Sequence, residues 1–234
     1  MPLNASQTSP TIDVTPPAAS LASSASVNPS PLDVGGFKDR VVAAARTVPT
    51  GTFVLVIKTG MVTGDLTLRY TGSYDVTNPA TPRCRLDGAQ NGQPLTVTVI
   101  GDKLYTRAGT GKYTLSSVSS SVTRLGLVTV RPDLPTLVGL VSSSVRELTY
   151  IAPDAVNGVP VQHWQALVDA SVFAPSATGT TAVELWLDSS DLLRQASYSL
   201  TTGDGSSSAT TVTLTYGGFN GPVSIREPDP SEVR

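Results

Sequence analysis

His163 is the only histidine in the 234 residues, so any catalytic site that needs an imidazole must be built around this one side chain. A Ser/His/Asp triad or a His-rich metal site would require it. His163 has no acidic residue next to it in the sequence that could orient it as a base. The chain also lacks a G-x-S-x-G motif. We therefore expect no enzyme activity, and a hydrolase that pairs His163 with one of the many serines is the least favoured alternative.

Other residues that could hold a metal or a phosphate are also sparse. Cys84 is the only cysteine, which excludes an intramolecular disulfide and a thiolate metal cage. The acidic residues are scattered, without the spacing of a calcium loop. Residues 108–113 (AGTGKY) lack two features of a phosphate loop, because Thr106 stands where the first glycine belongs and Tyr113 replaces the metal-binding hydroxyl. The sequence therefore predicts no catalytic residue, no metal and no cofactor.

The charge balance argues against nucleic acid as a partner. Sixteen Lys and Arg against 18 Asp and Glu give a net charge of -2, without a basic cluster to neutralise phosphates. The chain has 20 glycines, 18 prolines and long stretches rich in Ser, Thr and Val. These residues are typical of short strands and turns, so a mainly β protein is expected.

Alternation of apolar and polar residues predicts about ten or eleven strands joined by short turns such as Asn157-Gly158. The expected strands are 52–59, 65–75, 83–89, 95–100, 104–107, 145–151, 159–169, 181–188, 192–202, 209–216 and 223–226. Helical spacing appears at 36–48, with Asp33 as a cap, at 132–143, and as a third possibility at 117–127. A sheet of this size should curl around the helices, because a flat open layer rarely holds so many strands.

The chain divides into three parts by composition. Residues 1–31 are rich in Ser, Pro, Thr and Ala, and Asp13 is their only charged residue, so we expect a disordered spacer. They lack the basic start and apolar run of a signal peptide. Residues 32–226 are expected to form one domain, since no linker separates the strands before and after the helical insert. Residues 227–234 are expected to be a flexible tail.

Sorting the strands by parity gives each one an apolar face, and a curled sheet of this many strands can enclose a cavity large enough for a lipid. The residues expected to line an acyl cavity are Phe53, Leu55, Ile57, Leu66, Leu68, Tyr70, Val97, Val99, Leu137, Val141, Trp164, Val183, Leu185, Tyr198, Val212 and Leu214. The alternative is that these faces pack against the helices as a filled core. The residues alone favour neither interpretation.

Three runs of sequence resemble the actinobacterial LppX/LprA/LprF/LprG lipoprotein group. They are residues 99–107 (VIGDKLYTR), residues 156–164 (VNGVPVQHW) with Val168-Asp169, and residues 183–188 (VELWLD). Their order and spacing over residues 36–226 are similar too, although no single run is catalytic. The resemblance implies a LolA-like fold: a single mainly β (α+β) domain, in which an unclosed antiparallel half-barrel wraps around two or three helices.

The resemblance also implies export to the cell envelope, either the outer face of the cytoplasmic membrane or a periplasm-like space. It implies non-enzymatic binding and transport of a lipid or glycolipid between sheet and helices. The expected partners are that ligand, a membrane surface reached through an N-terminal anchor missing from this chain, and a membrane transporter. The group's anchor needs a lipobox cysteine, which residues 1–31 do not contain. The alternative function is an envelope scaffold or protein-interaction module with a filled core.

Overall fold

The computed structural model describes residues 32–60, 66–90, 92–119, 131–173, 177–201 and 209–234. Within these ranges eleven strands join in one antiparallel sheet. The strands are β1 (Thr50–Thr59), β2 (Leu66–Asp75), β3 (Arg83–Gln90), β4 (Gln93–Ile100), β5 (Lys103–Ala108), β6 (Thr114–Ser117), β7 (Glu147–Val156), β8 (Val159–Asp169), β9 (Thr180–Leu187), β10 (Leu193–Thr201) and β11 (Ala209–Gly217). The division of the chain into spacer, domain and tail stays a prediction.

The strand order β6-β5-β4-β3-β2-β1-β11-β10-β9-β8-β7 follows the sequence except where β1 pairs with β11. That pairing brings the first and last strands together at the centre, with Leu55 opposite Leu214. Strands β6 and β7 lie at the two ends of the order and do not pair with each other, so the described strands form an unclosed half-barrel. The predicted fold class is thereby confirmed.

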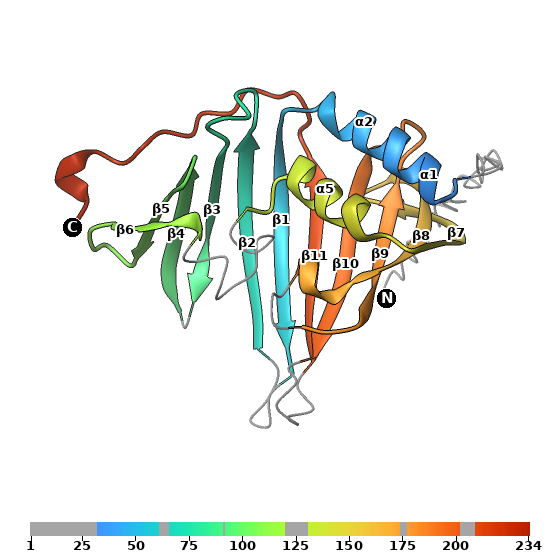
Figure 1. Cartoon of the computed structure of the whole chain (residues 1–234). Helices are drawn as coiled ribbons and strands as arrows, with labels where there is room; N and C mark the ends of the chain where they lie inside the picture. The colour runs from blue at the N-terminus through green and yellow to red at the C-terminus, as the bar shows by residue number, and fades with distance from the viewer. Residues whose placement is uncertain (1–31, 61–65, 91, 120–130, 174–176, 202–208) are drawn as a thin grey trace, which may run out of the picture. The chain divides into compact units, whose positions relative to one another are not determined.

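In the described part of the chain, two helices lie on one face of the sheet, which we call the inner face (Figure 1). The first consists of α1 (Val34–Gly36), a π-helical turn (Phe37–Val41) and α2 (Val42–Arg46), and the second is α5 (Leu134–Ser144). Asp33 and Asp133 cap them, because each carboxylate accepts a hydrogen bond from an N–H of the first turn, Gly36 at 2.7 Å and Thr136 at 2.9 Å. The helices predicted at 36–48 and 132–143 are confirmed. The one considered at 117–127 lies mostly outside the described residues.

Each helix buries one stripe against the sheet. Phe37 and Val41 of the first helix and Leu137 and Val141 of α5 are at most 1% exposed. The helices also contact each other, α2 against α5. Among the described residues no helix combines the length and the hydrophobicity of a membrane span.

Glycines in two strands make room for aromatic rings that lie across the sheet. Gly72 of β2 is in register with Phe53, and Gly88 of β3 is in register with Tyr70. A Cβ atom at Gly72 would lie 2.3 Å from Cζ of Phe53, and one at Gly88 would lie 2.3 Å from Cδ1 of Tyr70. Glycines covered by cross-strand aromatics are typical of strongly curved sheets, so these pairs help the half-barrel to curl.

The two edge strands are protected in different ways. The C-terminal segment lies beside the start of β6, where the Tyr113 N–H donates to the Glu232 carbonyl at 2.7 Å. Strand β7 contains Pro153 and an irregularity in pairing between Tyr150 and Ala152. Prolines and bulges are common devices against edge-to-edge association of sheets.

Two sequence predictions about strands are wrong. Residues 223–226 form no strand, although their apolar and polar residues alternate; the Ile225 carbonyl instead accepts a hydrogen bond from Arg83 at 3.1 Å. Strand β6 was not predicted, because its four residues are mostly exposed and carry no apolar alternation. The structure also has two short 3-10 helices, Ala170–Val172 and Pro230–Glu232. The flexibility expected of residues 227–234 stays a prediction.

Replacing Gly72 by Ala should destabilise the protein by about 1–3 kcal/mol, because the added methyl group overpacks against the Arg85 carbonyl oxygen and the Phe53 ring. The matched control is Gly217→Ala on β11, where a Cβ meets nothing within 4 Å. The control should change the free energy of unfolding by less than about 0.5 kcal/mol. Urea unfolding of both variants measures the difference, and equal stability of the two would contradict the packing described here.

Candidate functional site

The sixteen residues expected to line an acyl cavity lie mostly in one buried cluster on the inner face. The members that belong to this cluster are Phe53, Leu55, Tyr70, Val99, Leu137, Val141, Trp164, Val183, Leu185, Tyr198, Val212 and Leu214. Ile57, Leu68 and Val97 are partly buried and pack against it. Leu66, at the start of β2, is 36% exposed and lies outside the cluster. Their assignment to a ligand cavity stays a prediction.

Strand register explains why these side chains meet. Leu55 lies between Tyr70 of β2 and Leu214 of β11. In the same way, Leu185 lies between Trp164 of β8 and Ala196 of β10. Each row crosses the sheet on the inner face, as the parity of the strands predicts. The sheet therefore offers one continuous apolar surface to the helices.

This surface is closely packed. Val99, Val183, Leu185 and Leu214 are all 0% exposed. Phe173 stacks on Tyr198 with ring centroids 4.0 Å apart. An acyl chain would therefore have to replace contacts between helices and sheet in order to reach these side chains.

One polar atom is buried within the apolar surface without a partner. The indole N–H of Trp164 has no hydrogen-bond acceptor among the described residues, although the side chain is only 4% exposed. Its ring packs edge-on against Tyr150 at 5.1 Å between centroids. Buried indole N–H groups usually find an acceptor, so a ligand carrying a carbonyl or hydroxyl oxygen would satisfy it.

Polar groups gather where the helices meet the ends of β1, β2 and β11. The Tyr74 hydroxyl donates to the Val48 carbonyl at 3.3 Å, and the Tyr216 hydroxyl donates to the Pro132 carbonyl at 3.1 Å. Burial, with the nearby Asp133 carboxylate, raises the pKa of both phenols. These hydroxyls therefore remain neutral and fix the chain segments that enter β1 and α5.

Asp133 is the most deeply buried carboxylate of this region, at 1% exposure. Its Oδ1 accepts the hydrogen bond from Thr136, whereas its Oδ2 has no hydrogen-bond partner among the described residues. The nearest cation is Arg131, whose Nε lies 3.5 Å from Oδ2. Burial raises the pKa of Asp133, and Arg131 and Thr136 only partly oppose this effect.

A pocket of about 310 Å³ opens beside Asp133, and we call it the rim pocket. It lies between the end of α2, the connection from β2 to β3 and the start of α5. The residues that line it are Arg46, Pro49, Val76, Pro79, Pro82, Arg131, Asp133, Pro135 and Thr136. Val76 also packs against the inner-face cluster, so the pocket borders the apolar surface.

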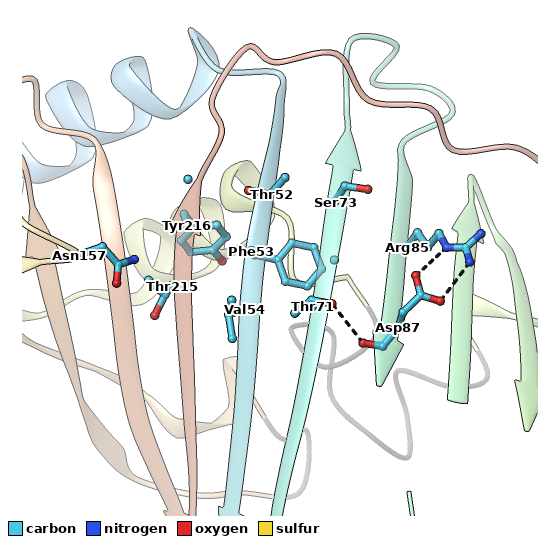
Figure 2. Close-up of a pocket in the computed structure, with 12 residues that line it drawn as sticks. Thr52, Phe53, Val54, Thr71, Ser73, Arg85, Asp87, Asn157, Thr215 and Tyr216 are labelled. Atoms are coloured by element: carbon cyan, nitrogen blue, oxygen red, sulfur yellow. Dashed lines mark hydrogen bonds and ion pairs between the residues drawn. The ribbon is translucent and has the colours of Figure 1, made fainter. Parts of the chain in front are cut away.

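A second pocket, of about 470 Å³, which we call the outer pocket, lies mainly over outward-facing residues of β11, β1, β2 and β3 (Figure 2). It is lined by Thr52, Phe53, Val54, Thr71, Gly72, Ser73, Arg85, Asp87, Asn157, Thr215, Tyr216 and Gly217. Arg85 donates to both carboxylate oxygens of Asp87, at 2.8 and 3.0 Å. These two charges compensate each other, so the remaining polar groups of the outer pocket are mainly hydroxyls, with the amide of Asn157.

Strand pairing gives His163 the acidic neighbour that its own sequence surroundings lack. Nε2 of His163 lies 2.6 Å from Oε2 of Glu184 on β9, and the imidazole stacks on Trp186 at 4.3 Å between centroids. No acidic residue lies beside His163 in the sequence, as stated above, but the register of β8 with β9 supplies Glu184 from a neighbouring strand. The partners found for His163 within the described ranges are the Glu184 carboxylate and the Trp186 ring, and no serine, threonine or cysteine is among them. In the same ranges no three His, Cys, Asp or Glu residues come together as a metal site.

The solved structures with a similar fold include two mycobacterial lipoproteins. The lipoprotein LppX of Mycobacterium tuberculosis has a TM-score of 0.58 and 18% sequence identity, over 82% of this chain and 98% of LppX. This chain shares the fold of LppX. LprF from Mycobacterium bovis has a TM-score of 0.56 and 14% identity, over 83% of this chain and 96% of LprF.

The two matches confirm the predicted resemblance to the LppX/LprA/LprF/LprG group at the level of the fold. No protein-family model matches the sequence, and no curated protein sequence matches it. The likeness to LppX therefore lies in the arrangement of strands and helices, over nearly the whole of that protein.

Sequence reasoning found the apolar face but missed both polar features of the site. Asp133 looks like an ordinary helix cap in the sequence, and its burial depends on Pro132 and α5 docking onto the sheet. The rim pocket joins segments that are far apart in the chain, such as Arg46 and Arg131. The one sequence signal for Asp133 was its position just before a helical pattern, which is typical of a helix cap.

Replacing Asp133 by Asn should change how stability depends on pH. The folded pKa of Asp133 lies above its ordinary value of 3.8, so the folded state binds more protons than the unfolded state above that pH. The free energy of unfolding that Asp133 contributes therefore falls as pH rises from about 4 through its raised folded pKa. Asn cannot titrate, so the variant should gain stability relative to the wild type over this range.

The measurement is urea unfolding of the wild type and Asp133→Asn at several pH values, followed by tryptophan fluorescence. Asn keeps an oxygen for the Thr136 N–H, so the helix cap is retained. A stability difference that stays constant between pH 4 and 7 would show that Asp133 does not titrate in this range.

Proposed function

We propose that this protein is a non-enzymatic carrier that binds lipid or lipoglycan in the cell envelope. The observation that supports it best is the continuous apolar inner face of an eleven-strand sheet, which only two helices cover in the described part of the chain. The resemblance to LppX and LprF adds support, because that lipoprotein group is expected to hold acyl chains between sheet and helices. The acyl cavity we propose is lined by the sixteen residues named from the sequence.

The energetics favour an acyl ligand. A chain of about 14 to 16 methylenes, at ~0.8 kcal/mol for each buried CH₂, would gain on the order of 10 kcal/mol before ordering costs. Helices α2 and α5 now occupy the inner face, so a ligand must move them away from the sheet. The acyl chain then replaces the apolar contacts that the helices lose, which keeps the net cost of opening small.

The location that fits this function is outside the cytoplasm, on the outer face of the cytoplasmic membrane or in a periplasm-like space. In this proposal residues 1–31 are a spacer and residues 32–226 carry the lipid. A membrane transporter would be the natural partner that delivers or accepts the ligand. No chemical step is assigned to the protein.

A second candidate function is an envelope scaffold or protein-interaction module. The full burial of Val99, Val183 and Leu185 favours it, because a filled core needs no ligand. In that case the inner face would serve folding alone.

Protein purified from an actinobacterial host should carry acyl lipid in roughly stoichiometric amount. The reason is that release of the lipid would expose the apolar inner face and the acyl chains to water, which is unfavourable. Organic extraction followed by mass spectrometry measures the lipid. Lipid-free protein that also takes up no added lipid would favour the scaffold.

Filling the inner face should block lipid uptake without unfolding the protein. Ile57 of β1 is partly buried and packs against the inner-face cluster, so Ile57→Trp adds volume where an acyl chain would lie. The matched control is Lys58→Trp, at the next residue, which is exposed on the opposite face. We expect Ile57→Trp to weaken binding of a fluorescent fatty acid about tenfold.

Lys58→Trp should bind the fluorescent fatty acid like the wild type, and both variants should melt within a few degrees of it. Circular dichroism gives the melting temperatures. Unchanged binding by Ile57→Trp would remove β1 from the proposed cavity.

A further inference from the structure

The rim pocket is lined by Arg131, a half-buried arginine whose guanidinium makes one long contact with the protein. The Arg131 side chain is 23% exposed, and its one ion pair among the described residues is the 3.5 Å contact with Asp133. Arginine has five N–H donors in a planar fork that matches a carboxylate or a phosphate. Most donors of this half-buried guanidinium are therefore available to a ligand in the pocket.

Arg46 adds a second positive charge to the same pocket. It ends α2, is exposed, and has no hydrogen-bond or ion-pair partner in the part of the chain that the structure describes. Two arginines thus line one pocket that contains a single carboxylate.

Asp133, in contrast to the arginines, needs a hydrogen-bond donor. Its Oδ2 atom is buried and accepts no hydrogen bond from any described residue, so it needs a donor. The N-terminus of α5 adds little attraction for an anion, because Asp133 itself already accepts the Thr136 N–H. The pocket therefore combines unsatisfied donors on arginine with one unsatisfied acceptor.

From these contacts we infer that the rim pocket binds the anionic head group of the carried lipid, and that this head group bears a hydroxyl beside its charge. The anion accepts hydrogen bonds from Arg131 and Arg46, and the hydroxyl donates to Oδ2 of Asp133. This inference rests on the proposed lipid-carrier function. The position of the pocket fits it, since Val76 lines the pocket and also packs against the apolar cluster that would hold the acyl chains.

The outer pocket does not meet these requirements, although it is larger. Its one guanidinium, Arg85, is already paired through two hydrogen bonds with Asp87. Asp87 also accepts a hydrogen bond from Thr96 at 2.9 Å. Because its charges are satisfied within the protein, the outer pocket offers no comparable attraction for an anion.

The experiment compares three lipids with the same fluorescently labelled acyl chains and different head groups. Phosphatidylglycerol has a negative charge and hydroxyls, diacylglycerol has a hydroxyl without charge, and phosphatidylcholine is zwitterionic without a hydroxyl. We expect the wild type to bind phosphatidylglycerol about tenfold more tightly than either of the others. Calorimetry with inorganic phosphate alone tests whether a free anion suffices.

The variants are Arg46→Gln, Arg131→Gln and the double substitution. Each single variant should reduce the preference for phosphatidylglycerol, and the double variant should bind phosphatidylglycerol and diacylglycerol equally. Arg46→Gln keeps the experiment interpretable if Arg131→Gln folds poorly, since Arg46 is exposed and unpaired within the described residues. The matched control is Arg69→Gln, an exposed arginine on β2 outside the pocket, which should leave the preference unchanged.

The outcomes separate the two proposals. Equal binding of all three lipids by the wild type would overturn the head-group inference and leave the carrier function standing. Binding of none of them would overturn the carrier function. Binding of inorganic phosphate without binding of phosphatidylglycerol would make the rim pocket a site for a small anion, which also overturns the inference.

Discussion

The architecture depends on covering the apolar inner face of the curled sheet. Leu55 and Leu214 lie at the centre of that face, where β1 pairs with β11, and rows of apolar side chains extend from them to both sides. The two helices that cover the face among the described residues are 13 and 11 residues long if the π-helical turn is counted with the first. Helices of this length are marginal in water by themselves, so they depend on the sheet as much as the sheet depends on them. A ligand that replaces one partner must offer the other a comparable apolar surface.

This constraint also decides where polar groups lie. An apolar layer tolerates buried polar atoms only when they find partners, and the hydroxyls of Tyr74 and Tyr216 find them in carbonyls at the ends of the strands. Asp133 and Trp164 are the exceptions, because each has one buried polar atom without a hydrogen bond among the described residues. They lie in different places, one at the rim and one within the apolar face. A lipid with a polar head and acyl chains would contact both kinds of surface.

Parity along the strands was enough to predict the inner face, because a period of two fixes which side chains share a surface whatever the strand order. It could not supply contacts between strands. The neighbour of His163 is Glu184, twenty-one residues away, and only the register of β8 with β9 shows it. Alternation also misled at residues 223–226, where no strand forms. The sequence could not predict whether the space between the sheet and the helices is filled, because that depends on how closely α2 and α5 pack against the inner face.

The rim pocket is built from the same elements that would have to move. Arg46 ends α2, Asp133 caps α5, and Val76 follows β2 on the sheet side. Any displacement that separates the helices from the sheet therefore changes the distances among the two arginines, the carboxylate and the sheet. A head group that bridges Arg46 and Asp133 would favour one separation over the others, because its own size fixes that distance. Head-group binding in the rim pocket and opening of the inner face would then be energetically coupled, so that each would favour the other.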